Sequence, residues 1–261
     1  MDEQISQKDL FTVPGAEPSL LRAGPVSCLL LHGFTSNPEE MQFLAADLHG
    51  RGYTVLNVRL AGHGTTPRDL RRTHWSDWLL SVEDGLDLLG GLSRQTVLIG
   101  QSMGGMVALT AAAQFPVAGV VALSTPYFGF PPVQVLLARL IGALGMTAHK
   151  QVKEHPELGQ RREADYPAYT RYPARIIVEL ARLQKAMHLS LPKVQAPALL
   201  VQSHQDMGGM DDLERIYALL GSAAKEKIWL DGFDHSIVRD EKRQVVFDAI
   251  GEFLKKIEVK K

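Results

Sequence analysis

Short apolar runs that alternate with helical segments constrain the fold of this chain more than any other feature. Six runs rich in Val, Leu and Ile have the length of buried strands. They cover residues 26–32, 53–59, 96–100, 119–123, 197–202 and 227–230. Helical patterns separate most of them, and this alternation predicts a mostly parallel sheet with helices on both faces. The expected fold class is therefore α/β.

The helices between these runs carry recognisable start signals. Asn37 suits an N-cap, Pro38 suits the first turn, and Glu40 stands where a capping-box acid reaches back to the cap. Residues 103–115 are rich in Gly and Ala, so a helix there can pack close to a sheet. Further helices are expected to begin near Ser76, Asp211 and Asp240.

Residues 125–192 interrupt the alternation because they contain no convincing strand. Two apolar helical segments, 133–144 and 174–187, flank a polar middle with several prolines. Loops longer than about 15 residues without a function are uncommon. We therefore expect a core of residues 1–125 and 193–261 with a cap inserted at 126–192, the alternative being a long linker with additional core helices.

A serine lies at the end of the third predicted strand, in Gly100-Gln101-Ser102-Met103-Gly104. The pattern G-x-S-x-G is common by chance, but here it follows a strand and opens a helix. A turn this tight forces strain on the serine and leaves no room for neighbouring Cβ atoms, which explains the glycines. The arrangement predicts that Ser102 is a nucleophile, the alternative being a Ser N-cap on a glycine-rich turn.

Two backbone amides are candidates for an oxyanion hole beside this serine. The first predicted strand ends in His32-Gly33-Phe34-Thr35, where a turn can present the N–H of Phe34. The N–H of Met103 lies at the start of the helix after the serine, where negative charge is favoured. An ordinary strand-ending turn, with His32 as a local hydrogen-bonding group, is the alternative.

A nucleophilic serine needs a base, and the base needs an acid that orients it. In sheets that carry a serine at such a turn, the acid follows a late strand and the base follows the last one. Of nine histidines, only His235 lies after the last predicted strand, while His204 lies next to the expected acid. His32 and His63 precede Ser102 in the chain and are expected to be structural or to line a pocket.

Asp206 is the expected acid because it lies just beyond the strand at 197–202. Its rivals Asp211 and Asp212 suit the N-terminus of a helix. Two other aspartates, Asp231 and Asp234, lie too close to His235 in sequence to be its usual partner.

Composition excludes several classes of protein and of site. The formal net charge of −1 gives no sign of a nucleic-acid partner, and the single cysteine, Cys28, excludes an intrachain disulfide. The polar start does not resemble a secretory signal, and the apolar segment 133–145 is too short to span a bilayer. We therefore expect a cytoplasmic protein without an integral membrane segment.

Metal and nucleotide motifs are also missing from the sequence. No cluster of His, Cys and Asp has the spacing of zinc ligands, and no Gly-x-Gly-x-x-Gly follows the first strand. We expect neither a metal nor a cofactor.

Six short motifs recur in an order that one family shares. They are His32-Gly33-Phe34-Thr35, Gly62-His63-Gly64-Thr65, Trp75-Ser76-Asp77-Trp78, the segment 100–105, and the loops of Asp206 and His235. From about Val26 to its final helix, the chain resembles the small bacterial carboxylesterases and the related bacterial monoacylglycerol lipases. One departure is Met207-Gly208-Gly209-Met210, where this group often has an apolar residue followed by Pro or Asn.

The resemblance implies an α/β-hydrolase fold, with a mostly parallel sheet flanked by helices and a small helical cap insertion. It implies ester hydrolysis without a cofactor. It assigns Ser102, Asp206 and His235 to the catalytic triad, and Phe34 and Met103 to the oxyanion hole.

The expected function is that of a serine carboxylesterase that hydrolyses a small-molecule ester of short to medium acyl chain through an acyl-enzyme. The apolar faces of 133–144 and 174–187 cannot all pack on a core that already has its helices, so some are expected to line an acyl pocket. The sequence shows no apolar pattern suited to docking on lipid, which favours soluble esters. Alternatives are a monoacylglycerol lipase with a longer acyl pocket, and a ligand-binding protein of this fold without catalysis.

Overall fold

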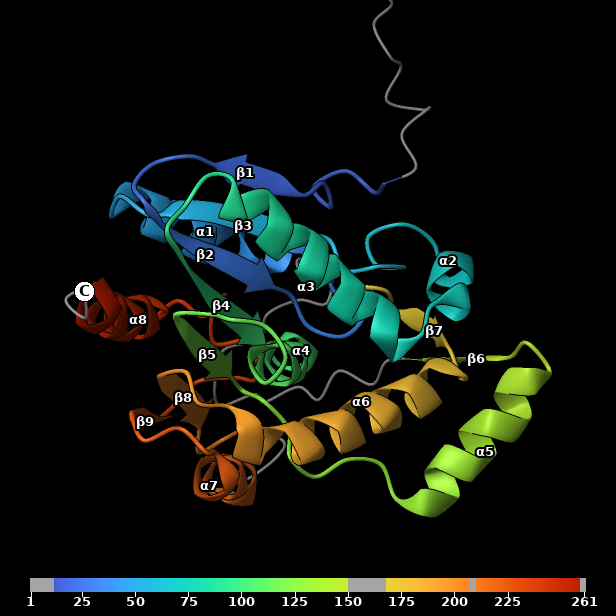
Figure 1. Cartoon of the computed structure of the whole chain (residues 1–261). Coiled ribbons are helices and arrows are strands. Elements are labelled where there is room, and N and C mark those ends of the chain that lie inside the picture. Colours follow the sequence, from blue (N-terminus) through green and yellow to red (C-terminus); the bar gives the residue numbers. More distant parts are fainter. Residues whose placement is uncertain (1–11, 150–167, 207–209, 259–261) are drawn as a thin grey trace, which may run out of the picture.

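The computed structural model describes residues 12–149, 168–206 and 210–258 (Figure 1). In this part of the chain, seven strands form one sheet in the order β1-β3-β2-β4-β5-β8-β9. All neighbours are parallel except β1, which runs antiparallel to β3. The strands are β1 Ser19–Leu21, β2 Val26–Leu31, β3 Thr54–Val58, β4 Gln95–Gln101, β5 Gly119–Leu123, β8 Ala198–Ser203 and β9 Lys225–Leu230. The prediction of a mostly parallel α/β sheet is confirmed.

Helices cover both faces because the central strands are apolar on both sides. In β2, Cys28 and Leu30 belong to one hydrophobic cluster and Leu29 and Leu31 to another. The first cluster lies under α1 and α8, and the second lies under α3, α4, α6 and α7. These helices are α1 Gln42–Gly50, α3 Trp75–Gly90, α4 Met103–Ala112, α6 Ile176–Ser190, α7 Met210–Leu219 and α8 Gln244–Glu258.

The segment between β5 and β8 differs from its prediction in one respect. It contains α5 Pro132–Ala143, β6 Thr147–His149, β7 Arg171–Pro173, α6 and the short 3-10 helix η5 Leu191–Lys193. The expectation of no strand here is wrong, because β6 and β7 pair antiparallel to form a small second sheet. Residues 150–167, which include two of the prolines of the polar middle, lie outside the described residues, as do residues 207–209.

The two helices of this segment pack very differently (Figure 1). The apolar side of α6, including Leu183 and Met187, is buried in the main core against α4 and α3. The apolar side of α5 is exposed instead, with Val133 at 67% and Leu140 at 58%. The chain was expected to show no large exposed apolar surface pattern for docking on lipid, and the exposed row of apolar side chains on α5 differs from that expectation. Within the three described ranges, no helix is long and apolar enough to cross a membrane.

Candidate active site

Ser102 lies at the junction of β4 and α4, in the tight turn that the sequence predicts. Its φ of 57° and ψ of −116° are unusual for a residue with a side chain. A Cβ on Gly100 would collide with the backbone of Gly104, and a Cβ on Gly104 would collide with the carbonyl of Leu31. Because Gly100 and Gly104 have no side chain, α4 can pack against the sheet, and Ser102 lies at the carboxyl edge of the sheet.

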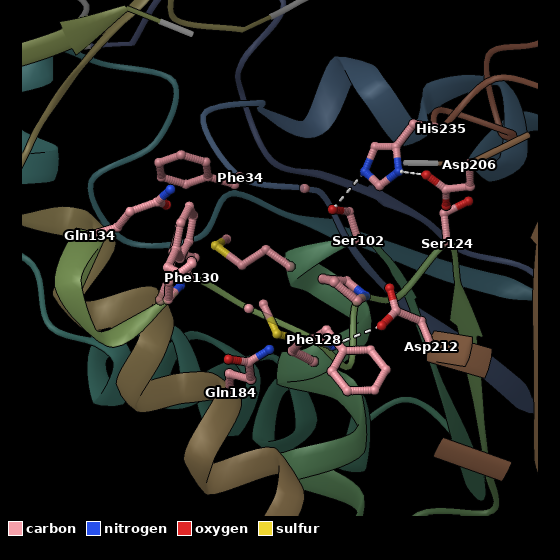
Figure 2. A pocket seen from close by; sticks show the side chains of 17 residues that line it. Phe34, Ser102, Ser124, Phe128, Phe130, Gln134, Gln184, Asp206, Asp212 and His235 are labelled. Carbon is pink, nitrogen blue, oxygen red and sulfur yellow. Dashed lines mark hydrogen bonds and ion pairs between the residues drawn. The ribbon is translucent and has the colours of Figure 1, made fainter. Parts of the chain in front are cut away.

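The structure brings Ser102, His235 and Asp206 into one chain of hydrogen bonds (Figure 2). The distance from Ser102 Oγ to His235 Nε2 is 2.9 Å, and from His235 Nδ1 to Asp206 Oδ1 it is 2.7 Å. The Asp206 side chain is 2% exposed and that of His235 is 32% exposed. An ionised Asp206 holds the proton on Nδ1, which leaves Nε2 free to accept the proton of the serine hydroxyl.

Two side chains that the sequence analysis did not single out hold the loop of His235 in place. Gln101 Nε2 donates to the carbonyl of His235 at 2.8 Å, and Ser203 Oγ donates to the carbonyl of Phe233 at 2.7 Å. Both residues end a core strand. Gln101 precedes Ser102 in the G-x-S-x-G motif, and this position beside the serine could have identified it as a residue of the site.

Phe34 and Met103 both border the cavity that contains Ser102. Met103 is the first residue of α4, so its N–H is outside the helical hydrogen-bond ladder. The carbonyl of Gly33 accepts a hydrogen bond from His32 Nδ1 at 2.9 Å. In a trans peptide the N–H points opposite to the C=O. The contact from His32 therefore turns the N–H of Phe34 away from the His32 ring.

Two buried side chains fix the loop that carries Phe34. The N–H of Gly33 donates to Glu40 Oε2 at 2.5 Å, and the N–H of Leu60 donates to His32 Nε2 at 3.2 Å. Burial lowers the pKa of His32 to about 4, so the ring is neutral at physiological pH. The assignment of Glu40 to a capping box is wrong: Asn37 caps the N–H of Glu39, while Glu40 turns toward Gly33.

A cavity of about 390 Å³ opens beside Ser102 (Figure 2). Apolar side chains supply most of its wall: Phe34, Met103, Met106, Phe128, Phe130 and Leu180. Of the helical faces that were expected to line an acyl pocket, that of α6 contributes Leu180. The apolar face of α5 contributes none of its predicted residues, and Phe128 and Phe130 come from the loop before α5.

The rivals for base and acid lie elsewhere or make other contacts. His204 stacks on Trp229 and pairs with Asp231 at 2.8 Å, outside the cavity. Asp212 does border the cavity, but its Oδ1 accepts the N–H of Phe128 at 2.7 Å. Burial raises the pKa of Asp212 to about 6. As a rival for the acid, Asp212 was expected to lie at a helix N-terminus, and its place in the cavity wall was not predicted.

The acidic, histidine and cysteine side chains show no metal-binding arrangement in the described residues. Across residues 12–149, 168–206 and 210–258, no three His, Cys, Asp or Glu side chains are arranged to hold a metal ion.

Similarity to known proteins extends over most of the chain. It is 31% identical to the thermostable monoacylglycerol lipase of Bacillus sp. (strain H-257), with 93% of this chain and 95% of the relative covered. It is 25% identical to a carboxylesterase of Bacillus subtilis (strain 168), with 93% and 97% covered.

Solved structures of lipolytic enzymes are also similar to this chain. One, from work on LipS and LipT, two metagenome-derived lipolytic enzymes, has a TM-score of 0.79 at 29% identity, covering 94% of this chain and 99% of that one. The monoacylglycerol lipase of Paleococcus ferrophilus has the same TM-score at 20% identity, covering 92% and 98%, and shows the shared fold. Residues 26–242 match the family described as serine aminopeptidase, S33. The chain belongs to this family of serine hydrolases with the α/β-hydrolase fold.

Proposed function

We propose that the protein hydrolyses carboxylic esters of short to medium acyl chain through an acyl-enzyme on Ser102. The observation that carries the proposal is the hydrogen-bonded series Ser102–His235–Asp206, which ends at an apolar cavity. A serine hydroxyl with a base on one side and an apolar binding space on the other is suited to acyl transfer.

In the first half of the proposed cycle, His235 Nε2 takes the proton of Ser102 Oγ as the oxygen attacks the ester carbonyl. Negative charge develops on the carbonyl oxygen, and the N–H groups of Phe34 and Met103 stabilise it. One such donor is worth about 10²–10³ in rate. His235 then gives its proton to the departing alcohol, which leaves the acyl group on Ser102.

In the second half, water takes the place of the alcohol. His235 removes a proton from the water as its oxygen attacks the acyl-enzyme, and then returns that proton to Ser102 Oγ. Asp206 stabilises the positively charged imidazole in both halves without becoming protonated. The acid leaves and the enzyme is restored.

Cavity size supports an ester of limited length. The 390 Å³ cavity lies near the lower end of the range of about 300–1,000 Å³ for small-molecule sites. We propose that the insertion 126–192 acts as a cap, because Phe128, Phe130 and Leu180 border the cavity from it. Each buried methylene adds at most about 0.8 kcal/mol, so specificity should rise with chain length and fall once the cavity is full.

The test is a series of p-nitrophenyl esters from acetate to palmitate, with kcat/KM measured for each. The proposal expects a maximum at short to medium chains, and efficient cleavage of emulsified triolein contradicts it. Labelling of Ser102 by a fluorophosphonate separates an enzyme from a ligand-binding protein of the same fold, which does not label.

A monoacylglycerol lipase is the second candidate. The 31% identity to the Bacillus enzyme of that name and the exposed apolar face of α5 favour it. Monoacylglycerols of matched chain length belong in the same series. A kcat/KM maximum at long acyl chains supports this candidate over the first. The cytoplasmic location and the absence of a cofactor stay predictions.

A further inference from the structure

Two side-chain oxygens in the wall of the active-site cavity, Asp212 Oδ2 and Ser124 Oγ, have no hydrogen-bond partner among the described residues. Asp212 is 0% and Ser124 is 1% exposed, and both border the cavity that contains Ser102. Buried polar atoms are nearly always paired, and leaving one unpaired costs about 1–3 kcal/mol. A pair of such atoms beside a nucleophile points to a ligand group that satisfies them.

The wall around Asp212 is otherwise well ordered by hydrogen bonds. Its Oδ1 accepts the N–H of Phe128, and the backbone N–H of Tyr127 also interacts with the carboxylate. The carbonyl of Tyr127 accepts from Gln184 Nε2 and from His188 Nε2. These contacts fix the loop before α5 and the plane of the carboxylate. Figure 2 shows one Asp212 oxygen on the bond to Phe128 and the other turned away from it.

The chemistry of the two atoms defines what they can bind. An ionised carboxylate only accepts hydrogen bonds, whereas a serine hydroxyl can donate or accept. A ligand hydroxyl group can donate to Asp212 Oδ2, and its oxygen can accept from Ser124 Oγ. Burial raises the pKa of Asp212 to about 6, so the acceptor form predominates at neutral pH.

We propose that Asp212 and Ser124 form a polar subsite that binds a hydroxyl group of the ester substrate. The inference rests on the proposed ester hydrolysis and adds a specificity to it. The hydroxyl can belong to the alcohol or to the acyl chain, and both need the same two contacts. A site built to pair a hydroxyl discriminates against an analogue that lacks the donor.

Two matched pairs of esters test the subsite. For the alcohol side, 2-hydroxyethyl butyrate is compared with 2-methoxyethyl butyrate. For the acyl side, ethyl 3-hydroxybutyrate is compared with ethyl 3-methoxybutyrate. The wild type should show at least a tenfold higher kcat/KM for the hydroxyl ester in one pair or both, and the pair that responds shows where the hydroxyl lies.

The variant Asp212→Asn should remove or reverse the preference for the hydroxyl ester. Its Oδ1 still accepts the N–H of Phe128, so its amide nitrogen takes the place of Oδ2 and donates instead of accepting. The ratio of hydroxyl to methoxy ester should fall to about one or below, because the ether oxygen can accept from the amide. Ser124→Ala should lower the ratio at least threefold, and Asp211→Asn, at an exposed neighbour, should not change it.

Outcomes for the subsite and for the proposed function are separable. If the wild type does not hydrolyse p-nitrophenyl butyrate, the proposed function itself fails. If it does, ratios near one in both pairs overturn the subsite, as does a ratio that either Asp212→Asn or Ser124→Ala leaves unchanged. Labelling of Ser102 by a fluorophosphonate in each variant shows that the altered ratio does not come from unfolding.

Discussion

Ser102 combines a strained backbone with the proposed nucleophilic oxygen. A non-glycine residue at φ 57° costs on the order of 1–3 kcal/mol, which the packing of β4 and α4 against each other must offset. Ser102→Ala keeps that backbone and removes only Oγ. We expect kcat for p-nitrophenyl butyrate to fall by about 10⁴-fold or more, with an unchanged circular dichroism spectrum. Near-normal turnover in this variant contradicts the proposed mechanism.

Asp206 is distinguished from the other aspartates by its contact with His235 Nδ1. Asp206→Asn can hold the ring in the wrong tautomer, with the proton on the nitrogen that faces Ser102. We expect kcat to fall by about 10³–10⁴-fold. Asp211→Asn is the matched control on an exposed residue and should stay within about twofold. If steady-state kinetics show equal losses of kcat in the two variants, Asp206 is not the acid of the triad.

His32 acts on the proposed oxyanion hole through the peptide that follows Gly33. His32→Ala removes the donor to the Gly33 carbonyl but leaves the N–H of Phe34 present and less well aimed. We expect kcat to fall about 10–100-fold with KM within about threefold, less than the complete loss of an oxyanion donor. His32→Asn has an amide that can donate to the same carbonyl and should recover part of kcat. An equal loss in both variants indicates a structural role alone.

Among the elements, the long apolar strands were predictable because burial on both faces leaves a continuous pattern in the sequence. Each of the six predicted strands lies within two residues of an observed one. Among the described residues, the missed elements are β1, β6, β7 and η5, with three residues each, and α2, Pro67–Arg72. Such short elements depend on pairing or packing with distant segments, which no local pattern records.

The candidate site likewise contains residues that a local sequence pattern predicts and contacts between distant segments that no pattern predicts. Ser102, Asp206 and His235 follow strand ends, so the topology of a parallel sheet predicts their common edge. The contact between Asp212 and Phe128 joins residues 84 apart, and nothing near either one signals the other. Glu40 and Gly33 are only seven residues apart, but the capping pattern gave Glu40 a competing local explanation.

Close packing of α4 against β2 gives a prediction at the level of these elements. In Gly104→Ala the new Cβ collides with backbone atoms of Leu31 and His32, which cannot move without breaking the sheet. We expect a loss of several kcal/mol in the free energy of unfolding, measured with urea. Gly90→Ala, at the exposed end of α3 where a Cβ meets nothing within 4 Å, should be neutral or stabilise by up to about 1 kcal/mol. Similar losses in both variants contradict the packing argument.

For the molecule as a whole, two buried groups give its stability opposite dependences on pH. His32 has a pKa of about 4 in the fold and 6.5 outside it, so the unfolded chain binds the extra proton and stability rises with pH through this window. Asp212 has a pKa of about 6 in the fold and 3.8 outside it, so the folded chain binds the extra proton and stability falls as pH rises from about 4 to 6. Each contribution is on the order of 3 kcal/mol. The two contributions oppose each other, so they largely cancel in the pH dependence of the wild-type free energy of unfolding. A substitution of one residue is needed to measure its contribution.

Asp212→Asn isolates the contribution of the buried carboxylate. The amide keeps the acceptor for Phe128 and has no charge to bury at any pH, so the variant escapes the loss that the wild type suffers as Asp212 ionises. The free energy of unfolding of the variant minus that of the wild type should therefore increase by about 2–3 kcal/mol between pH 4 and pH 7. Urea denaturation at several pH values measures this difference, with Asp211→Asn as the control that should stay near zero throughout. A difference for Asp212→Asn that is constant or falls with pH means that the carboxylate is not desolvated in the folded protein.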